Sequence, residues 1–188
     1  KLNNNNKNGI VLMHLLTDVT RLRNEQIWIN NYLEWLFETI SHCSNNKEIN
    51  WFFKAHPFEK TYPILDKHSK AIKNKIKENG FTYIEPDEQF LHRDVAKLAS
   101  IVITCHGTCK IEYPALYKIP VISCVGYNNL TYDAEKLPFT AKNSLEYSEL
   151  IMNAGKLSIS KKALRIAKEL LVFNKIFSGK NINEEINI

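Results

Sequence analysis

Three of the six histidines in this chain stand at the ends of short apolar runs: His14, His56 and His106. A histidine in such a place can donate a hydrogen bond, or carry a positive charge, toward a phosphate or a departing leaving group. Pro57 restricts the backbone at His56 and so fixes the angle of that imidazole, and Lys54 adds a cation nearby. Taken alone His56 could equally cap a turn, but the similar position of His106 favours chemistry on an anion.

A second group of candidate residues surrounds a glycine. Gly107 and Thr108 separate the apolar run 101–104 from a predicted helix over 109–117. Glycine lets the backbone approach an anion, and the start of a helix presents unpaired N–H groups, to which the threonine hydroxyl adds a donor. Glu112 lies one turn further on the same side and could accept from ribose hydroxyls, or could simply be an acid favoured by the helix dipole. The pattern predicts a phosphate site.

The elements that must position these residues alternate between strands and helices. Short apolar runs predict strands, and apolar residues at helical spacing predict helices. The expected strands are 9–16, 50–55, 81–84, 101–104 and 120–124, and the expected helices are 26–43, 63–79, 92–99, 109–117 and 158–177, with Gly80 ending the second helix. This order predicts an α/β, Rossmann-like domain with a parallel sheet of about five to six strands flanked by helices. We expect residues 1–8 to be a polar linker and residues 9–188 to form that single domain.

The carboxyl ends of all strands in a parallel sheet lie at one edge, where ligands bind. We therefore expect His14, His56, His106 and the turn at Gly107 to meet there. Asp18, after the first strand, and Glu85, after the third, are weaker candidates at the same edge. Asp18 could act as a base or bind a sugar, or could cap the following segment.

Metals and disulfides are disfavoured by the spacing of the ligating residues. The four cysteines show no CxxC pattern, and reduced, intracellular thiols are the better interpretation. Cys105 and Cys109 are expected to be small buried residues rather than nucleophiles. The candidate histidines come from separate strands without a cluster of carboxylates, and a DxD motif is absent, so we expect neither a metal nor another cofactor.

The net charge of +5 arises largely from lysines at 67–77 and 156–180. These are expected to be solvated helix faces, with an anionic membrane surface or a polyanionic glycan as the alternative partner. Nucleic acid is disfavoured because the aromatic residues do not alternate with the basic ones. No stretch approaches the roughly 20 apolar residues of a membrane span. We expect a cytoplasmic protein, with peripheral contact at the inner face of the membrane as the alternative.

The segments Lys54-Ala-His-Pro57, Thr104–Glu112 and Ile119-Pro-Val-Ile122 together resemble a known family. They look like the carboxy-terminal, donor-binding half of GT-B glycosyltransferases of bacterial capsule and surface polysaccharide synthesis. The similarity is to the group with an HP motif and a Ser/Thr-Gly motif, which includes capsule Kdo transferases, polysialyltransferases and teichoic-acid glycerophosphotransferases. The segment Tyr32–Thr39 also looks like capsule-synthesis proteins, and the resemblance covers about residues 9–178.

This resemblance implies metal-independent transfer from a CMP-, CDP-, UDP- or GDP-linked sugar. It implies that His56 contacts the donor phosphate with Lys54 and Pro57 beside it, that Gly107 and Thr108 bind the same phosphate, and that Glu112 binds ribose. His56 and His106 become the candidate catalytic residues, although serine or another small residue is common at the position of His106. The glycan acceptor would bind to an N-terminal half outside this chain.

Three other functions remain open at this point. A glycerol- or other alditol-phosphate transferase would use the same fold and anion site, with attack at phosphorus. A sugar-nucleotide epimerase has a similar fold. A non-catalytic nucleotide-sugar-binding module would bind the ligand and leave the chemistry to a partner.

Overall fold

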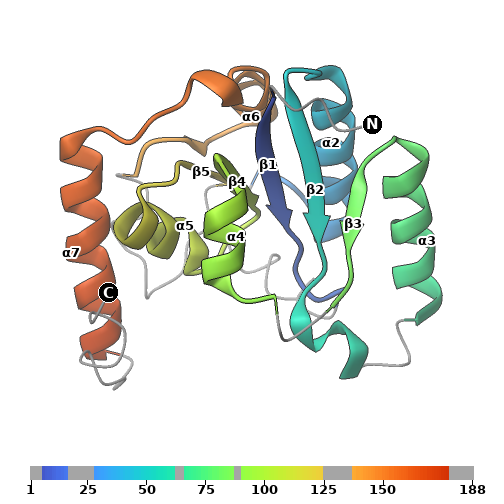
Figure 1. Ribbon diagram of the computed structural model, residues 1–188, viewed down its shortest axis with the longest axis horizontal. Helices are drawn as coiled ribbons and strands as arrows, with labels where there is room; N and C mark the ends of the chain where they lie inside the picture. Colours follow the sequence, from blue (N-terminus) through green and yellow to red (C-terminus); the bar gives the residue numbers. More distant parts are fainter. Residues whose placement is uncertain (1–5, 17–27, 62–65, 87–89, 125–136, 178–188) are drawn as a thin grey trace.

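A computed structural model describes residues 6–16, 28–61, 66–86, 90–124 and 137–177. Its described strands form one six-stranded parallel sheet in the order β3-β2-β1-β4-β5-β6 (Figure 1). The strands are β1 Lys7–Leu12, β2 Ile49–Lys54, β3 Thr82–Ile84, β4 Ile101–Thr104, β5 Val121–Cys124 and β6 Thr140–Ala141. This order is that of a Rossmann-like sheet, in which the chain reverses direction across the sheet between β1 and β4. The predicted fold class is confirmed.

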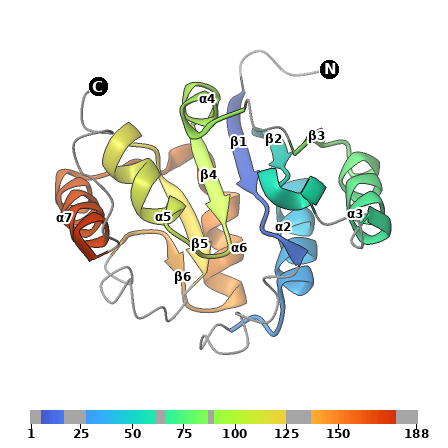
Figure 2. The same cartoon turned by 90° about the horizontal axis from the view of Figure 1, so that it is seen from below.

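Helices cover both faces of the sheet (Figures 1 and 2). On one face α2 (Tyr32–Asn45), α3 (Asp66–Glu78) and α6 (Ser144–Met152) pack over the larger hydrophobic core. The other face is covered by α4 (His92–Leu98) and α5 (Cys109–Glu112), which form a smaller core with β1, β2, β4 and β5. The helix α7 (Lys161–Phe177) packs on the outer side of α5 through Ala167 and Leu170. None of the described helices combines the length and apolarity that a bilayer crossing requires.

The strands alternate between the two cores, as the two-residue period of a strand requires. Val11 and Phe53 belong to the larger core, whereas their neighbours Ile10 and Phe52 belong to the smaller one. The same alternation assigns Lys54 and Thr104, the last residues of β2 and β4, to the face covered by α4 and α5. Polar residues that end these strands are therefore directed to one side of the sheet.

Two predicted helices begin too early. The helix expected from residue 26 begins at Tyr32, because Asn31 is extended and its side chain accepts a hydrogen bond from the Glu34 N–H. The helix expected from residue 158 begins at Lys161, where the Ser160 hydroxyl accepts from the Ala163 N–H. The predicted glycine end of α3 is confirmed, since Gly80 has φ +81° and donates to the Lys77 carbonyl.

The predicted helix 109–117 consists of α5 and a π-helical turn, Tyr113–Tyr117. Pro114 explains the change, because it has no N–H to continue the α-helical hydrogen-bond ladder. Lys118 then ends the segment in the left-handed conformation with φ +56°, and its N–H bonds to the Pro114 carbonyl. This wide turn carries the buried side chain of Tyr113 into the smaller core.

The strand β6 and the helix α6 were not predicted from the sequence. The strand β6 has two residues, too few for an alternating pattern. The helix α6 carried a start signal, since the Asn143 side chain accepts from the Glu146 N–H and Glu146 accepts from the Lys142 N–H. Its Tyr147 and Ile151 complete the larger core.

Gly9 allows β1 to lie close to the indole of Trp51 on β2. These residues are paired in the sheet, and Trp51 is buried with its Nε1 donating to the Asn46 carbonyl. A Cβ at position 9 would overlap the Cζ3 and Cε3 atoms of Trp51 and lie 2.9 Å from Ile49 Cγ2. A rigid, hydrogen-bonded ring in a packed core has little room to yield, so the central pair of strands depends on this glycine.

We expect Gly9→Ala to lower the free energy of unfolding by about 1–3 kcal/mol, the usual cost of overpacking a core. Gly155→Ala is the matched control, because a Cβ there would meet Ile49 Cδ1 at an ordinary 3.6 Å. Its effect should stay within about 0.5 kcal/mol. Urea denaturation of both variants checks this, and equal stabilities would contradict the role given to the Gly9–Trp51 contact.

Candidate functional site

The pairing of β1 with its two neighbours brings three histidines to one level of the sheet edge. Leu12 pairs with Lys54 of β2 on one side and with Thr104 of β4 on the other. In each of the three strands a histidine follows two residues later: His14, His56 and His106. The predicted convergence of these histidines at the carboxyl edge is therefore present, at the point where the strand order reverses.

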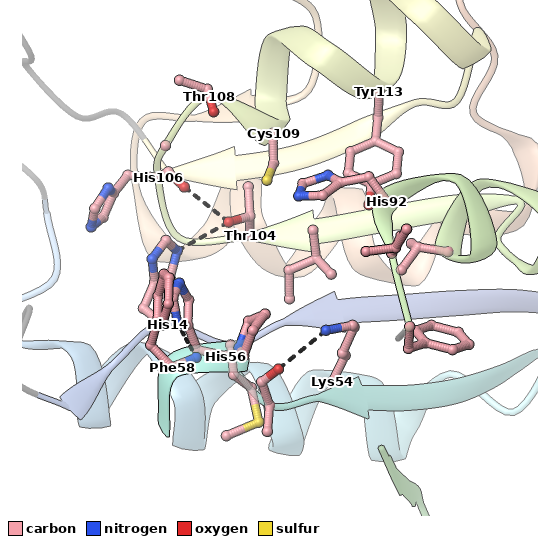
Figure 3. Close-up of a pocket in the computed structure, with 18 residues that line it drawn as sticks. His14, Lys54, His56, Phe58, His92, Thr104, His106, Thr108, Cys109 and Tyr113 are labelled. Carbon is pink, nitrogen blue, oxygen red and sulfur yellow. Dashed lines mark hydrogen bonds between the residues drawn. The ribbon is translucent and has the colours of Figure 1, made fainter. Parts of the chain in front are cut away.

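A cavity of about 560 Å³ opens at this edge, between the ends of the strands and the helices α4 and α5 (Figure 3). In Figure 3, His14, His56 and Phe58 lie on one side of it and His92, Cys109 and Tyr113 on the other. Its lining combines polar groups at the strand ends with apolar side chains. The lining residues are Leu12, Met13, His14, Lys54, Ala55, His56, Pro57, Phe58, Phe90, Leu91, His92, Val95, Thr104, His106, Gly107, Thr108, Cys109 and Tyr113.

His14 stands at the centre of a polar network. Its ring stacks on that of His106, with centroids 4.4 Å apart, and its Nε2 lies 3.0 Å from Thr104 Oγ1. The Thr104 hydroxyl donates its single proton to the His106 carbonyl at 2.9 Å. The Thr104 hydroxyl oxygen must therefore accept a hydrogen bond from His14 Nε2. This assigns the proton of the neutral imidazole to Nε2 and leaves Nδ1 as an acceptor.

The surroundings of His14 favour its neutral form. Burial, followed by the nearby His106 and His56, holds the pKa of His14 well below its ordinary value of 6.5. The phenol of Tyr32 accepts a hydrogen bond from the His14 backbone N–H at 2.9 Å, and its ring contacts the imidazole edge-on. The helix α2, which begins at Tyr32, thus fixes the backbone from which His14 projects.

His56 and Lys54 provide the donors at the end of β2. His56 Nδ1 accepts from the Phe58 N–H at 3.2 Å, in the short 3₁₀ turn Pro57–Thr61. This contact leaves Nε2 as the nitrogen that can donate to a ligand. Lys54 is only 6% exposed; its Nζ lies 3.4 Å from the Ala55 carbonyl and 5.9 Å from the centre of the Phe90 ring. A buried ammonium at a cavity wall suits an anionic ligand.

The glycine turn after β4 lies where the sequence predicts it. Gly107 has φ +101°, and its nearest neighbour for a Cβ would be His14 Cε1 at 3.7 Å. Thr108 is exposed and precedes α5, and its carbonyl accepts from the N–H groups of Ile111 and Glu112. Both residues line the cavity.

Three other candidates are placed differently. The Glu112 carboxylate lies 3.9 Å from His92 Nδ1 and is not among the residues that line the cavity. Glu85 pairs with Lys73 and lines a separate hollow beside α3, so the structure does not bring it to the histidines. Asp18 lies outside the described residues.

The structure adds residues that the sequence analysis did not select. Thr104 was given no role of its own in the site, although its two-residue spacing from His106 could have suggested a contact. Tyr113 is fully buried, and its phenol oxygen has no hydrogen-bond partner among the described residues, while the residue lines the cavity. Phe58 and Leu91 are 58% and 45% exposed at the same cavity. No spacing rule links these positions, since they come from separate elements.

The cysteines differ from one another. Cys105 is buried, as predicted, whereas Cys109 is only partly buried and lines the cavity. Burial, followed by the nearby Glu112 carboxylate, raises the pKa of the Cys109 thiol to about 12. A thiol that stays protonated at neutral pH is a poor nucleophile, which agrees with the expectation that Cys109 is not a nucleophile.

No family model matches the sequence, and no curated protein does. Solved structures similar in fold include the accessory secretory protein 1, 2 and 3 structure from Streptococcus pneumoniae, with a TM-score of 0.49 and 14% identity over 89% of this chain. Another is a mutant O-GlcNAc transferase from Thermobaculum terrenum, with a TM-score of 0.49 and 12% identity over 92% of this chain. The chain spans 30% and 32% of the length of these two structures, respectively. Similarity at this level carries no argument about activity.

The lowered pKa of His14 predicts a loss of stability in mild acid. Below pH 6.5 the unfolded chain takes up a proton at this residue that the folded chain resists, so stability falls as the pH drops from 6.5 toward the folded pKa. We expect His14→Gln to flatten this part of the profile of unfolding free energy against pH. His68→Gln, at an exposed position on α3, is the control and should leave it unchanged. Parallel profiles for His14→Gln and the unsubstituted chain would contradict the assignment.

Proposed function

We propose that this chain is the donor-binding part of a glycosyltransferase that uses a nucleotide-activated sugar. The observation that supports it best is the convergence of Lys54, His56 and the Gly107–Thr108 turn on one cavity at the point where the strand order reverses. Rossmann-like sheets bind phosphate-containing ligands at this position. The side chains of Lys54 and His56 can donate hydrogen bonds to the phosphates of such a ligand, and the glycine turn lets the backbone approach them.

In this proposal the phosphates lie among Lys54, His56 Nε2 and the turn at Gly107. The apolar lining, which includes Phe58, Phe90 and Leu91, offers surface to the rings of the nucleoside or sugar. The unpartnered phenol of Tyr113 is a further donor, and a buried hydroxyl without a partner costs about 1–3 kcal/mol until a ligand or water satisfies it.

The proposed reaction is displacement at the activated sugar carbon. The acceptor oxygen forms a bond to this carbon while the bond from the carbon to the donor phosphate oxygen breaks, and the phosphate leaves with the electron pair. Lys54 and His56 stabilise the negative charge that develops on the leaving phosphate. In this step the stabilising groups are therefore side chains of this chain. The acceptor proton passes to a base in the acceptor-binding part of the enzyme.

The narrower assignments rest on the motifs around His56 and Gly107. We propose surface polysaccharide synthesis as the process, a CMP-, CDP-, UDP- or GDP-linked sugar as the donor, and a glycan as the acceptor, bound outside this chain. Glu112 is the proposed ribose ligand, and its carboxylate lies beside His92, 3.9 Å from Nδ1, so the ligand has to reach past that ring. His106 is proposed to act through its stacking on His14.

We expect CMP, CDP, UDP or GDP to raise the melting temperature, because a ligand that binds only the folded state stabilises it. For the best of these nucleotides, His56→Ala should weaken binding by about tenfold to a hundredfold, the loss of one hydrogen bond to a charged group. His68→Ala on the exposed face of α3 should bind normally. Calorimetric titration measures both, and unchanged binding by His56→Ala would overturn the site.

The glycine turn gives a second test with an internal control. Gly107→Ala and Gly80→Ala both put a Cβ on a residue with positive φ, at +101° and +81°, without a steric overlap. Each should therefore lose roughly 1–2 kcal/mol of stability. Only Gly107→Ala should also weaken nucleotide binding, because Gly80 lies at the end of α3. Equal effects on binding would show that the turn acts through stability alone.

A further inference from the structure

The wall of the cavity opposite His14 and His56 carries a group of potential metal ligands (Figure 3). His92, the first residue of α4, faces Cys109 and Glu112 on α5. One ligand atom from each of the three residues lies within 4.8 Å of the other two. Figure 3 shows the His92 ring beside the Cys109 sulfur. Among the described residues, this cluster brings the three kinds of ligand that zinc uses in proteins to one place.

The separations fit a metal centre after a small adjustment. Ligand atoms around a tetrahedral zinc ion lie about 3.3–3.8 Å apart, given bonds of about 2.0–2.3 Å. His92 Nδ1 and Glu112 Oε2 are already 3.9 Å apart. The His92 side chain is 59% exposed, so a small shift of its ring can close the remaining gap without disturbing the core.

Neighbouring contacts hold two of the ligands in place. The ring of Tyr113 stacks on the His92 imidazole, with centroids 5.5 Å apart and an interplanar angle of 27°. Cys109 and Glu112 are three residues apart on α5, which places their side chains on the same side of the helix. The cluster is therefore partly organised before any ion binds.

We propose that His92, Cys109 and Glu112 bind a zinc-class divalent ion with three protein ligands. Metal binding displaces the proton of the Cys109 thiol, and the resulting thiolate, together with imidazole, favours zinc over magnesium or calcium, which prefer oxygen. His92 and Cys109 line the cavity whereas Glu112 does not, so an ion bound by the three residues would lie at the cavity wall. The site goes beyond the proposed transfer reaction, and its test uses metal ions without nucleotide. Glu112 cannot hold the ion and contact a ribose with the same carboxylate oxygens, so in the metal-bound chain the ribose contact proposed above is absent. The expectation of no metal was argued from the histidines at the strand ends, whereas these three residues come from the helices α4 and α5.

Cobalt titration tests the proposal without any nucleotide. In the presence of a phosphine reductant, one equivalent of Co²⁺ should produce a saturable thiolate-to-cobalt absorption band. Zn²⁺ should abolish that band at stoichiometric amounts, because it displaces Co²⁺ from such ligands, and Mg²⁺ in excess should not. Cys109→Ser should remove the band, while Cys43→Ala, which removes a buried thiol on α2, should retain it.

His92→Gln and Glu112→Gln keep the thiol and serve as the second pair of variants. Each should weaken Zn²⁺ binding at least about tenfold, measured by competition with a chromogenic chelator, since even outer-shell partners contribute that much. His68→Gln, on α3, should bind Zn²⁺ as the unsubstituted chain does. The proposal is overturned if no saturable band forms, if the band persists in Cys109→Ser, or if both glutamine variants bind Zn²⁺ normally. Circular dichroism on each variant separates loss of the site from loss of the fold.

Discussion

The register of β1 between β2 and β4 is the constraint on which the site depends. Because Leu12 is paired with Lys54 on one side and with Thr104 on the other, the three strands end at the same height. The histidine that follows each strand after two residues then reaches the same cavity. A slip of one residue in any of these pairings would direct the strand's side chains to the opposite face of the sheet. Gly9 supports this register, since it lets Trp51 pack against β1.

The same convergence divides the electrostatic roles in the cavity. Three imidazoles and one ammonium in a partly buried space cannot all be charged without strong repulsion. Burial and the two neighbouring histidines keep His14 neutral, and Thr104 fixes its tautomer. His14 therefore acts as a structural partner of His106, and Lys54 and His56 are the two side chains that the proposed function assigns to an anionic ligand.

The sequence was sufficient for the fold class and for the polar edge, because both follow from local patterns. Apolar runs predicted the parallel strands, and Gly107 between a strand and a helix predicted a turn. In the structure Gly107 has a positive φ. The exact starts of α2 and α7 were set by the caps Asn31 and Ser160, which the helical period alone does not reveal. Tyr113 and His92 could not be found, because their meeting depends on how α4 and the π-helical turn pack on the sheet.

The packing of α7 on α5 also affects when the cavity is completed during synthesis of the chain. Ile111 and Ala115, behind the wall that carries Gly107 and Cys109, are covered by Ala167 and Leu170 of α7. During synthesis the strands that carry the three histidines leave the ribosome well before that helix. The nascent chain can thus form one half of the cavity early, while the other half lacks its outer support until α7 emerges. The wall of the cavity that carries Gly107 and Cys109 is consequently completed late in synthesis.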